Sequence, residues 1–387
     1  VRVGIHTGGV LLGGGAGAPS AIRGAAVNVA ARMEQTAPAG GLRISHETYV
    51  HVRGVFDIEA QDPLSIKGVD EPVVTYLVIG VKPRPFRVST RGIEGLETRM
   101  IRRGSELQQL QSCFQRVFDH RKLAIVTVVA DAGIGKSRLV YEFANWAEAQ
   151  SKRFVMFRGR ATPHAQRQPY SLLRDIIGSW LGIADDEPLH AARHKIEQEI
   201  GQLFVGYDSD LAESHAHVLG HLLGFDFSAS PHIRGIRDDP GQIRNRAFHV
   251  VAQMFRRVST KDGMPIVLQL EDLHWADDGS LEFLRYVAQV NRGVPMVIVA
   301  CARPTLFERS GAWQTDDDDH LRIDLGALDR GSSDSLADEL LKRLAYIPAA
   351  LRELVIGRAE GNPFYMEELV RTLIDQGAIA THGPYSE

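Results

Sequence analysis

A short segment that combines glycines, a lysine and a serine, residues 130–137, has the composition of a phosphate-binding loop. Gly133 and Gly135 would let successive backbone N–H groups turn inward around phosphate oxygens. Lys136 would supply a full positive charge to the β- and γ-phosphates, and the hydroxyl of Ser137 is a hard oxygen ligand suited to Mg²⁺. We therefore predict a binding site for a nucleoside triphosphate with magnesium, and Mg-ATP is the first candidate.

The sequence on both sides of this loop supports the prediction. Residues 123–130 form an apolar run typical of a buried strand, and residues 136–149 have a helical pattern whose N-terminus would add partial positive charge. Ala130 stands where the usual motif has its first glycine, a position at the strand end that tolerates a methyl group. A chance Gly-Lys-Ser turn is the alternative. The residues expected to contact the nucleotide are Asp131, Ala132, Gly133, Ile134, Gly135, Lys136, Ser137 and Arg138.

Two acidic residues, Glu271 and Asp272, end a second apolar strand predicted over residues 265–270. Carboxylates at the C-terminal edge of a buried strand face the crevice where open α/β sheets bind ligands. One acid would orient a magnesium-bound water and the other would polarise an attacking water, and either order is chemically possible. We assign Asp272 to the metal, together with Ser137. The alternative is a solvated acidic strand end.

Arg303 follows a third apolar strand, predicted over residues 295–302. A guanidinium at this edge would reach a γ-phosphate and report its presence. A surface arginine at a strand end is the alternative interpretation. With Glu271 and Asp272, Arg303 completes the predicted catalytic set of this part of the chain.

Three stretches here resemble the STAND-type, AAA-related signalling ATPases: GIGKSRL at 133–139, EDLHWAD at 271–277 and GNPF at 361–364. The resemblance covers about residues 98–376. It implies that the last stretch belongs to a helical lid below the nucleotide, and that nucleotide state controls packing of the lid and of attached domains. It also implies a position near the base for Arg103.

In the N-terminal part, Asn28 and Arg32 are four residues apart on a helix predicted over 25–37, so both would project from one face. An amide and a guanidinium together suit a phosphate whose charge is being redistributed. On spacing alone, an ordinary polar helix face is the stronger interpretation.

The surrounding sequence, VRVGIHTG at 1–8, VNVAARME at 27–34 and IKGVDEPV at 66–73, resembles the C-terminal half of a class III adenylate/guanylate cyclase catalytic domain. The resemblance implies that Asn28 and Arg32 stabilise the transition state of cyclisation and that Lys67 contacts the base. It also implies a dimer that builds each site across two chains. We therefore expect a homodimer through this domain or an oligomer through the ATPase domain.

The sequence departs from the cyclase pattern in two places. The family's two metal-binding aspartates belong to the first half of the domain, which this sequence does not include. The stretch PSAIRGA at 19–25 lacks the acidic base-reading residue and the Gly-Asp pair. We expect no cyclisation by these residues alone, and altered base preference and a degenerate regulatory domain both stay open. A third hypothesis, a small-molecule kinase, is disfavoured because no acceptor pocket or mobile acidic base is evident.

Length and composition set the frame for these sites. A chain of 387 residues suggests two or three domains, and 44% apolar with 24% charged residues is ordinary for a globular protein. A formal charge of −4 predicts neither nucleic acid nor an anionic membrane as a partner. Two cysteines, no apolar run of about 20 residues and no signal peptide favour a cytoplasmic protein. The sequence begins without methionine, and we expect it to be a piece of a longer protein.

The predicted fold class is α/β: a partial ferredoxin-like α+β cyclase domain, then a P-loop NTPase with a parallel sheet and a helical lid. The expected boundaries are 1–82 for the partial cyclase domain, 83–97 for a linker, 98–330 for the ATPase and 331–387 for a truncated lid. In the first domain we expect strands over 1–6 and 9–12 around a turn at Thr7-Gly8, and further strands over 42–45, 56–58 and 73–79.

Two pairs of histidines, His190 with His194 and His217 with His221, are each four residues apart. Such pairs on a helix can bind zinc. Because no third ligand stands beside either pair at a suitable spacing, we expect solvated helix faces instead.

Overall fold

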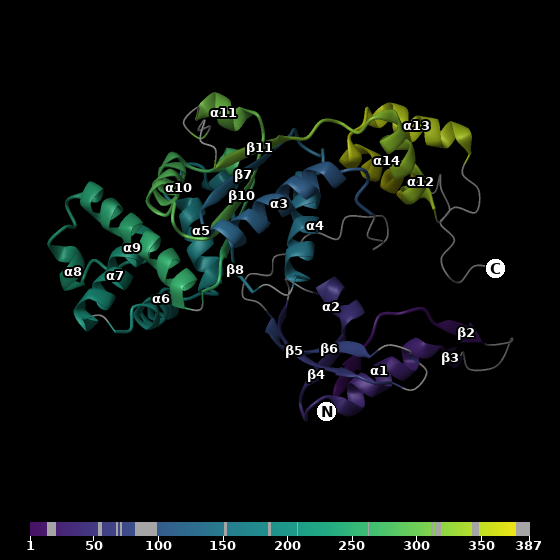
Figure 1. Ribbon diagram of the computed structural model, residues 1–387, viewed down its shortest axis with the longest axis horizontal. Helices are drawn as coiled ribbons and strands as arrows, with labels where there is room; N and C mark the ends of the chain where they lie inside the picture. The colour runs from purple at the N-terminus through teal and green to yellow at the C-terminus, as the bar shows by residue number, and fades with distance from the viewer. Residues whose placement is uncertain are drawn as a thin grey trace. The chain divides into compact units, whose positions relative to one another are not determined.

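The computed structural model describes residues 1–13, 21–52, 56–66, 69, 72–81, 99–150, 153–184, 187–206, 208–261, 263–310, 313, 319–342 and 348–376. The chain divides into two compact units, Val1–Ser89 and Thr90–Glu387 (Figure 1). The predicted linker at 83–97 and Lys67 lie outside the described residues.

The first unit is built on a mixed four-stranded sheet of order β1-β4-β6-β5. Helix α1 (Ala25–Thr36) follows β1 in the chain and leads to β4, which is parallel to β1, so the three form a β-α-β crossover. The other two pairings are antiparallel. The strands are β1 (Val3–Ile5), β4 (Leu42–Ser45), β5 (Phe56–Leu64) and β6 (Val73–Val81).

Helix α1 packs tightly on this sheet. Its buried residues, Ala26, Val29 and Met33, recur at helical spacing and form one apolar face. Gly4 in β1 makes the close approach possible, because a Cβ atom there would lie 2.1 Å from the backbone nitrogen of Glu34. Helix α1 is thus fixed against β1 by a position that only glycine fits.

The expected turn at Thr7-Gly8 between two adjacent strands is wrong. Strand β1 pairs with β4, and β2 (Leu11–Gly13) pairs instead with β3 (Ala21–Arg23) in a separate antiparallel ladder. A local alternation of residues indicates a strand but not its partner, and the partner here is set by the α1 crossover. Strand β3 and helix α2 (His46–Val52) were not predicted.

The second unit contains a five-stranded sheet of order β11-β7-β10-β9-β8, and all its pairings are parallel. This confirms the predicted parallel sheet. The strands are β7 (Ala124–Val129), β8 (Val155–Arg160), β9 (Ile266–Glu271), β10 (Met296–Ala302) and β11 (His320–Asp324). Strand β7 lies between β10 and β11, whereas the next strand in the chain, β8, lies at the far edge. Ligands of open α/β sheets bind at such a switch in strand order.

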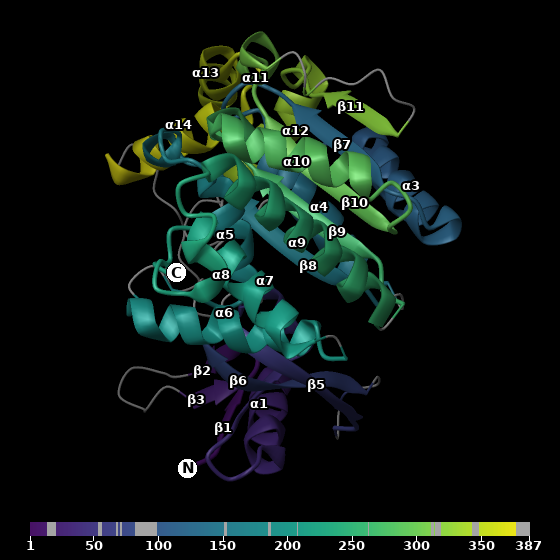
Figure 2. The ribbon, with the colours of Figure 1, turned by 90° about the vertical axis from the view of Figure 1, so that its left-hand side faces the viewer.

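Helices cover both faces of this sheet (Figures 1 and 2). One face carries α3 (Gly104–His120) and α4 (Lys136–Glu148), which bury Phe114 and Phe143 against Val126 and Val128. The other carries α5 (Ser171–Trp180), α9 (Pro240–Lys261) and α10 (Asp278–Val290). Burial on both faces explains why the strands read as continuous apolar runs.

The connection from β8 to β9 contains a group of helices that extends away from the sheet (Figure 1). Between α5 and α9 it includes α6 (Leu189–Leu203), α7 (Ser209–Leu222) and the short α8 (Pro231–Arg234). Short helices also occur at Pro163–Ala165, at Leu273–Trp275 and at α11 (Thr305–Arg309).

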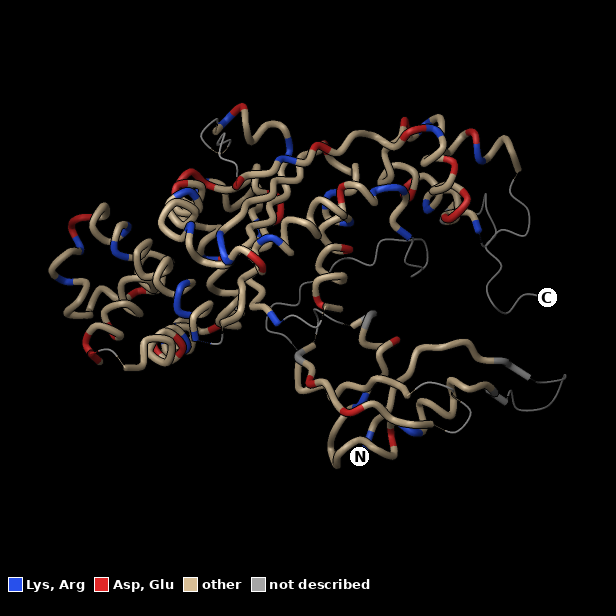
Figure 3. The backbone as a smooth tube through the Cα atoms, viewed as in Figure 1, with Lys and Arg blue, Asp and Glu red and all other residues tan. Residues whose placement is uncertain are grey.

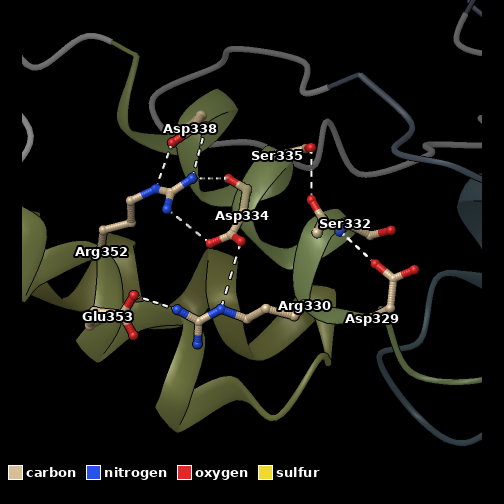
Figure 4. Close-up of polar contacts among 9 residues, drawn as sticks. Asp329, Arg330, Ser332, Asp334, Ser335, Asp338, Arg352 and Glu353 are labelled. Carbon is tan, nitrogen blue, oxygen red and sulfur yellow. Dashed lines mark hydrogen bonds and ion pairs between the residues drawn. The ribbon is translucent and has the colours of Figure 1, made fainter.

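The described C-terminal residues after β11 form three helices: α12 (Arg330–Leu341), α13 (Ala349–Ala359) and α14 (Pro363–Asp375). This agrees with the predicted helical lid. Ion pairs join α12 to α13: Arg352 pairs with both Asp334, at 2.9 Å, and Asp338, at 2.8 Å, and Arg330 pairs with Glu353 (Figure 4). The first two lid helices also pack together around the buried Leu336 and Val355.

Acidic and basic residues are interspersed along the described chain (Figure 3). Among the described residues, no helix has the length and apolar character needed to cross a membrane.

Candidate functional site

The loop between β7 and α4 has the backbone conformation expected of a phosphate-binding loop. Gly133 and Gly135 have φ angles of 82° and 105°, which lie in the left-handed region that favours glycine. Gly135 is the N-cap of α4, so Lys136 and Ser137 lie in the first turn of that helix. The loop therefore joins a strand end to a helix N-terminus, where anions bind.

The ammonium group of Lys136 lies across this loop. Its Nζ donates to the backbone oxygens of Ala130, at 2.7 Å, and Asp131, at 2.8 Å, and the residue is buried. Burial lowers the pKa of Lys136, because it disfavours the charged form. A phosphate bound at this point would supply the opposite charge that a buried ammonium requires.

The two predicted acids are placed differently. Glu271 is buried at the end of β9, and burial is the main cause that raises the pKa of its carboxyl. Asp272 follows it with a φ of 53°, an uncommon conformation for a residue other than glycine. The charge of Asp272 reaches the loop, since it counteracts the lowering of the Lys136 pKa. The structure thus brings both acids to the edge of the sheet that carries the loop.

Arg160, at the end of β8, was missed by the sequence analysis. Its Nε and Nη2 both lie 3.3 Å from Oδ2 of Asp272, and its Nε lies 3.9 Å from Oε2 of Glu271. Strand β8 pairs with β9 so that Arg160 stands opposite Glu271. The apolar strand β8 was the available signal in the sequence. Because β8 and β9 are parallel, a residue that ends β8 lies beside the acids that end β9.

A second group beside the acids consists of Arg303 and His274. Arg303 follows β10, and its charge lowers the pKa of both Lys136 and His274. Burial is the largest cause of the lowered His274 pKa, about 4, so the ring is neutral at pH 7. Both ring nitrogens of His274 and Nε of Arg303 are buried without a hydrogen-bond partner among the described residues. Unpartnered polar atoms of this kind suit a polar ligand.

The lid contacts the loop directly. Nδ2 of Asn362 donates to the backbone oxygen of Ala132 at 3.0 Å, and the backbone N–H of Phe364 donates to the backbone oxygen of Gly133 at 3.3 Å. The side-chain oxygen of Asn362 also caps α14 by accepting from Phe364 N at 3.1 Å. A Cβ atom on Gly133 would lie 2.4 Å from this oxygen. One asparagine therefore starts the last lid helix and fixes it to the loop.

A pocket opens beside the loop, between the start of α3 and the lid. Its walls mix apolar side chains with arginines, and Arg103 and Arg138, both singled out from the sequence, belong to it. Arg103 also pairs with Glu106 at 3.1 Å, and Arg138 pairs with Glu142. The pocket suits a planar base with polar edges. Apolar lining residues include Ile101, Ile134, Leu328, Leu336, Pro363 and Phe364, and Glu367 adds an acidic group.

In the first unit, Asn28 and Arg32 are both exposed on α1, whereas Ala26, Val29 and Met33 of the same helix are buried. Nη1 of Arg32 lies 3.5 Å from the side-chain oxygen of Gln35. The two residues share one face of the helix, as expected from their spacing. Their role in cyclisation stays a prediction.

Comparison with known families agrees with both parts of this description. Residues 99–299, just over half of the chain, match the family model described as AAA ATPase domain. Residues 1–80 match the model described as Adenylate and Guanylate cyclase catalytic domain.

Individual relatives were found as well. An uncharacterized protein of Rhizobium meliloti (strain 1021) is 26% identical over 287 residues, which cover 73% of this chain and 26% of the relative. The chain thus spans about a quarter of the length of that relative.

Two solved structures match segments of this chain. The guanylate cyclase domain of RhGC from Catenaria anguillulae in complex with GTP is 35% identical, with 21% of this chain and 45% of that chain covered and a TM-score of 0.18. The Drosophila ORC bound to DNA is 12% identical, with 75% and 60% covered and a TM-score of 0.42.

Proposed function

Since this chain belongs to the AAA ATPase family and also carries a segment of an adenylate and guanylate cyclase catalytic domain, we propose that it is an ATP-dependent signalling protein. In this proposal the second unit binds and hydrolyses ATP, and the nucleotide sets the position of the helical lid. The lid position in turn reports the nucleotide state to the cyclase part.

The loop residues fit the phosphates of ATP. Lys136 would bind the β- and γ-phosphates, and the base would enter the pocket lined by Arg103 and Ile134. The hydroxyl of Ser137 and the carboxylate of Asp272 are hard oxygen donors of the kind that Mg²⁺ takes. When bound there, the ion would neutralise charge on the phosphate oxygens.

The acids suit hydrolysis. A buried carboxyl whose pKa is raised accepts a proton more readily near neutral pH, so Glu271 would take the proton of an attacking water. Asp272 would then belong to the metal, and Arg303 would contact the γ-phosphate. The buried, unpartnered atoms of Arg303 and His274 are consistent with a site for phosphate oxygens.

One observation carries the switching part of the proposal: the hydrogen bond from Asn362 to Ala132 O. Because Ala132 and Gly133 would have to adapt to phosphate, any change in the loop reaches the N-terminus of α14 through this side chain. The lid helices α12 and α13 are joined by ion pairs and would follow as one block. A local event at the phosphates would therefore move the whole lid.

Calorimetry of ATP binding tests the nucleotide site. Lys136→Ala removes the ammonium charge that the loop places on the phosphates, so we expect binding to be lost. Lys261→Ala, an exposed lysine at the end of α9, is the control and should bind as the wild type does. Unchanged affinity in Lys136→Ala would refute the assignment.

The cyclase part supports two functions. In the first, the domain makes a cyclic nucleotide, with Asn28 and Arg32 acting on the transition state and the missing metal ligands supplied outside residues 1–80. The absence of an acid from the PSAIRGA stretch at 19–25 favours the second, a regulator or scaffold with a degenerate cyclase domain.

The cyclase and the regulator are distinguished by an assay of cyclic-nucleotide formation, carried out on the natural protein that contains this sequence. Activity with Mg²⁺ or Mn²⁺ that is lost in Arg32→Ala supports the enzyme. If no product forms from ATP or GTP under either metal, the regulator is favoured.

A further inference from the structure

Helices α7 and α8 belong to the group of helices between β8 and β9 (Figure 1). Together they bring two histidines and a glutamate close to one another. Glu213 and His217 are one turn apart on α7, and His232 comes from α8. One ligand atom from each of the three lies within 4.8 Å of the others. Oε1 of Glu213 lies 3.8 Å from Nδ1 of His217 and 4.0 Å from Nε2 of His232.

We propose that Glu213, His217 and His232 form a binding site for a divalent transition-metal ion, with Zn²⁺ as the best fit. Imidazole nitrogens and a carboxylate oxygen are the donors that zinc takes in proteins. Ligand atoms of a tetrahedral zinc are about 3.4 Å apart, so small side-chain rotations close the observed distances. Asp210 can complete the set, because its Oδ1 lies 3.8 Å from Nε2 of His232.

Glu197 on α6 is a positioning residue for this site. Its Oε1 lies 3.2 Å from Nε2 of His217, the ring nitrogen that points away from Glu213. With Nε2 donating to Glu197, the lone pair of Nδ1 is directed at the metal position. A carboxylate behind a ligating histidine is the usual arrangement around protein-bound metals.

The proposed ion would replace one existing contact. Oγ of Ser230 lies 2.7 Å from Nδ1 of His217 and also accepts from the backbone N–H of His232 at 3.1 Å. A metal ion would take over the bond to Nδ1 and leave the second bond in place. Glu197, Glu213 and His217 also line a pocket between α6 and α7, which gives the ion a path from solvent.

The expectation of a solvated helix face is wrong for His217. A solvated face was expected for His217 and His221, but His217 is buried, and its neighbours are Glu213 and His232 rather than His221. The third ligand is supplied by a different helix, which spacing along one helix cannot reveal.

Metal binding to the chain without a polyhistidine tag tests the proposal, with chelator-treated protein and no nucleotide present. Competition of Zn²⁺ with a chromophoric chelator measures stoichiometry and affinity, and Co²⁺ absorption reports the coordination geometry. We expect one tight equivalent of Zn²⁺ and the intense visible bands of tetrahedral Co²⁺. Excess Mg²⁺ should not displace either ion, because Mg²⁺ prefers oxygen ligands.

The variants distinguish this site from other histidines. Glu213→Ala changes an exposed side chain, and both it and His232→Ala should abolish the tight equivalent. His190→Ala with His194→Ala, an exposed pair on α6, is the matched control and should bind as the wild type does. Glu197→Gln should keep the Co²⁺ band positions but weaken Zn²⁺ binding about 10- to 100-fold.

Folding is checked by circular dichroism of each variant without metal. The proposal is overturned if the wild type retains no Zn²⁺, if folded Glu213→Ala binds it equally well, or if the control pair removes the binding. Displacement by Mg²⁺ would also overturn it, because it would indicate an all-oxygen site.

Discussion

The guanidinium of Arg160 is bonded to the carboxylate of Asp272, with two nitrogens 3.3 Å from the same oxygen. The pair joins the ends of two neighbouring strands, β8 and β9. It places a positive charge beside the acid that we assign to magnesium, so Arg160 and Mg²⁺ would compete for one carboxylate.

We expect Arg160→Gln to tighten the apparent Mg²⁺ affinity in ATP hydrolysis. Arg160 is largely exposed, and exposed ion pairs contribute roughly 0.2–1 kcal/mol, so the gain should not exceed about fivefold. Titration of steady-state ATPase activity with Mg²⁺ measures it. Arg322→Gln, in strand β11 at the opposite edge of the sheet, is the control. The competition would be contradicted if the apparent Mg²⁺ affinity of Arg160→Gln did not increase, or if it changed equally in both variants.

A second prediction concerns Asp272→Asn, which should slow hydrolysis far more than it weakens ATP binding. The amide keeps the shape of the side chain but loses the charge that the metal needs, and we expect kcat to fall by about 100-fold or more. Calorimetry and single-turnover hydrolysis measure the two effects separately. Asp324→Asn, at the end of β11, should leave both unchanged, and equal turnover in Asp272→Asn would exclude the role.

The link between loop and lid is tested with Asn362→Ala. Loss of the helix cap should cost about 1 kcal/mol of unfolding free energy. Asp329→Ala is the matched control, because Asp329 caps α12 by accepting from Ser332 N at 2.7 Å, and among the described residues no hydrogen bond or ion pair joins it to the loop.

Hydrogen exchange of α14 with and without ATP then distinguishes two roles of Asn362, the cap of α14 and the link between the loop and α14. We expect ATP to change the protection of α14 in the wild type and in Asp329→Ala, but not in Asn362→Ala. A response of the same size in all three proteins would show that the asparagine does not carry the signal.

A fourth prediction follows from His274, whose pKa of about 4 lies below its ordinary value of 6.5. Below pH 6.5 the unfolded state binds a proton that the folded state does not, so stability falls as the pH drops from 6.5 to 4. The loss should approach about 3 kcal/mol at the acid end.

Urea unfolding followed by tryptophan fluorescence at several pH values measures this loss. His274→Gln should remove that part of the acid dependence, whereas the exposed control His164→Gln should retain it. Identical pH profiles for the wild type and His274→Gln would refute the assignment.

Much of the candidate site was accessible from sequence because its parts are local. Glycines and a lysine between an apolar strand and a helix indicate the loop at 130–137. Glu271 and Asp272 are recognised because they end another apolar strand. Both patterns depend on short-range geometry, which residue order largely determines. Arg160 escaped notice because nothing in its immediate neighbours distinguishes it from a surface polar residue. His274 lies within the EDLHWAD stretch at 271–277, but residue order alone does not show that its ring is buried.

The residue order by itself determined the two-part organisation, the phosphate-binding loop and the acidic strand end, because each depends on backbone conformation and burial within one segment. Only the tertiary structure decided which strands pair, that β8 brings Arg160 to Asp272, and that Asn362 reaches back 230 residues to Ala132. Such contacts depend on the order of strands in the sheet and on how helices close over it. These are properties of the packed core as a whole, so no single stretch of sequence contains them.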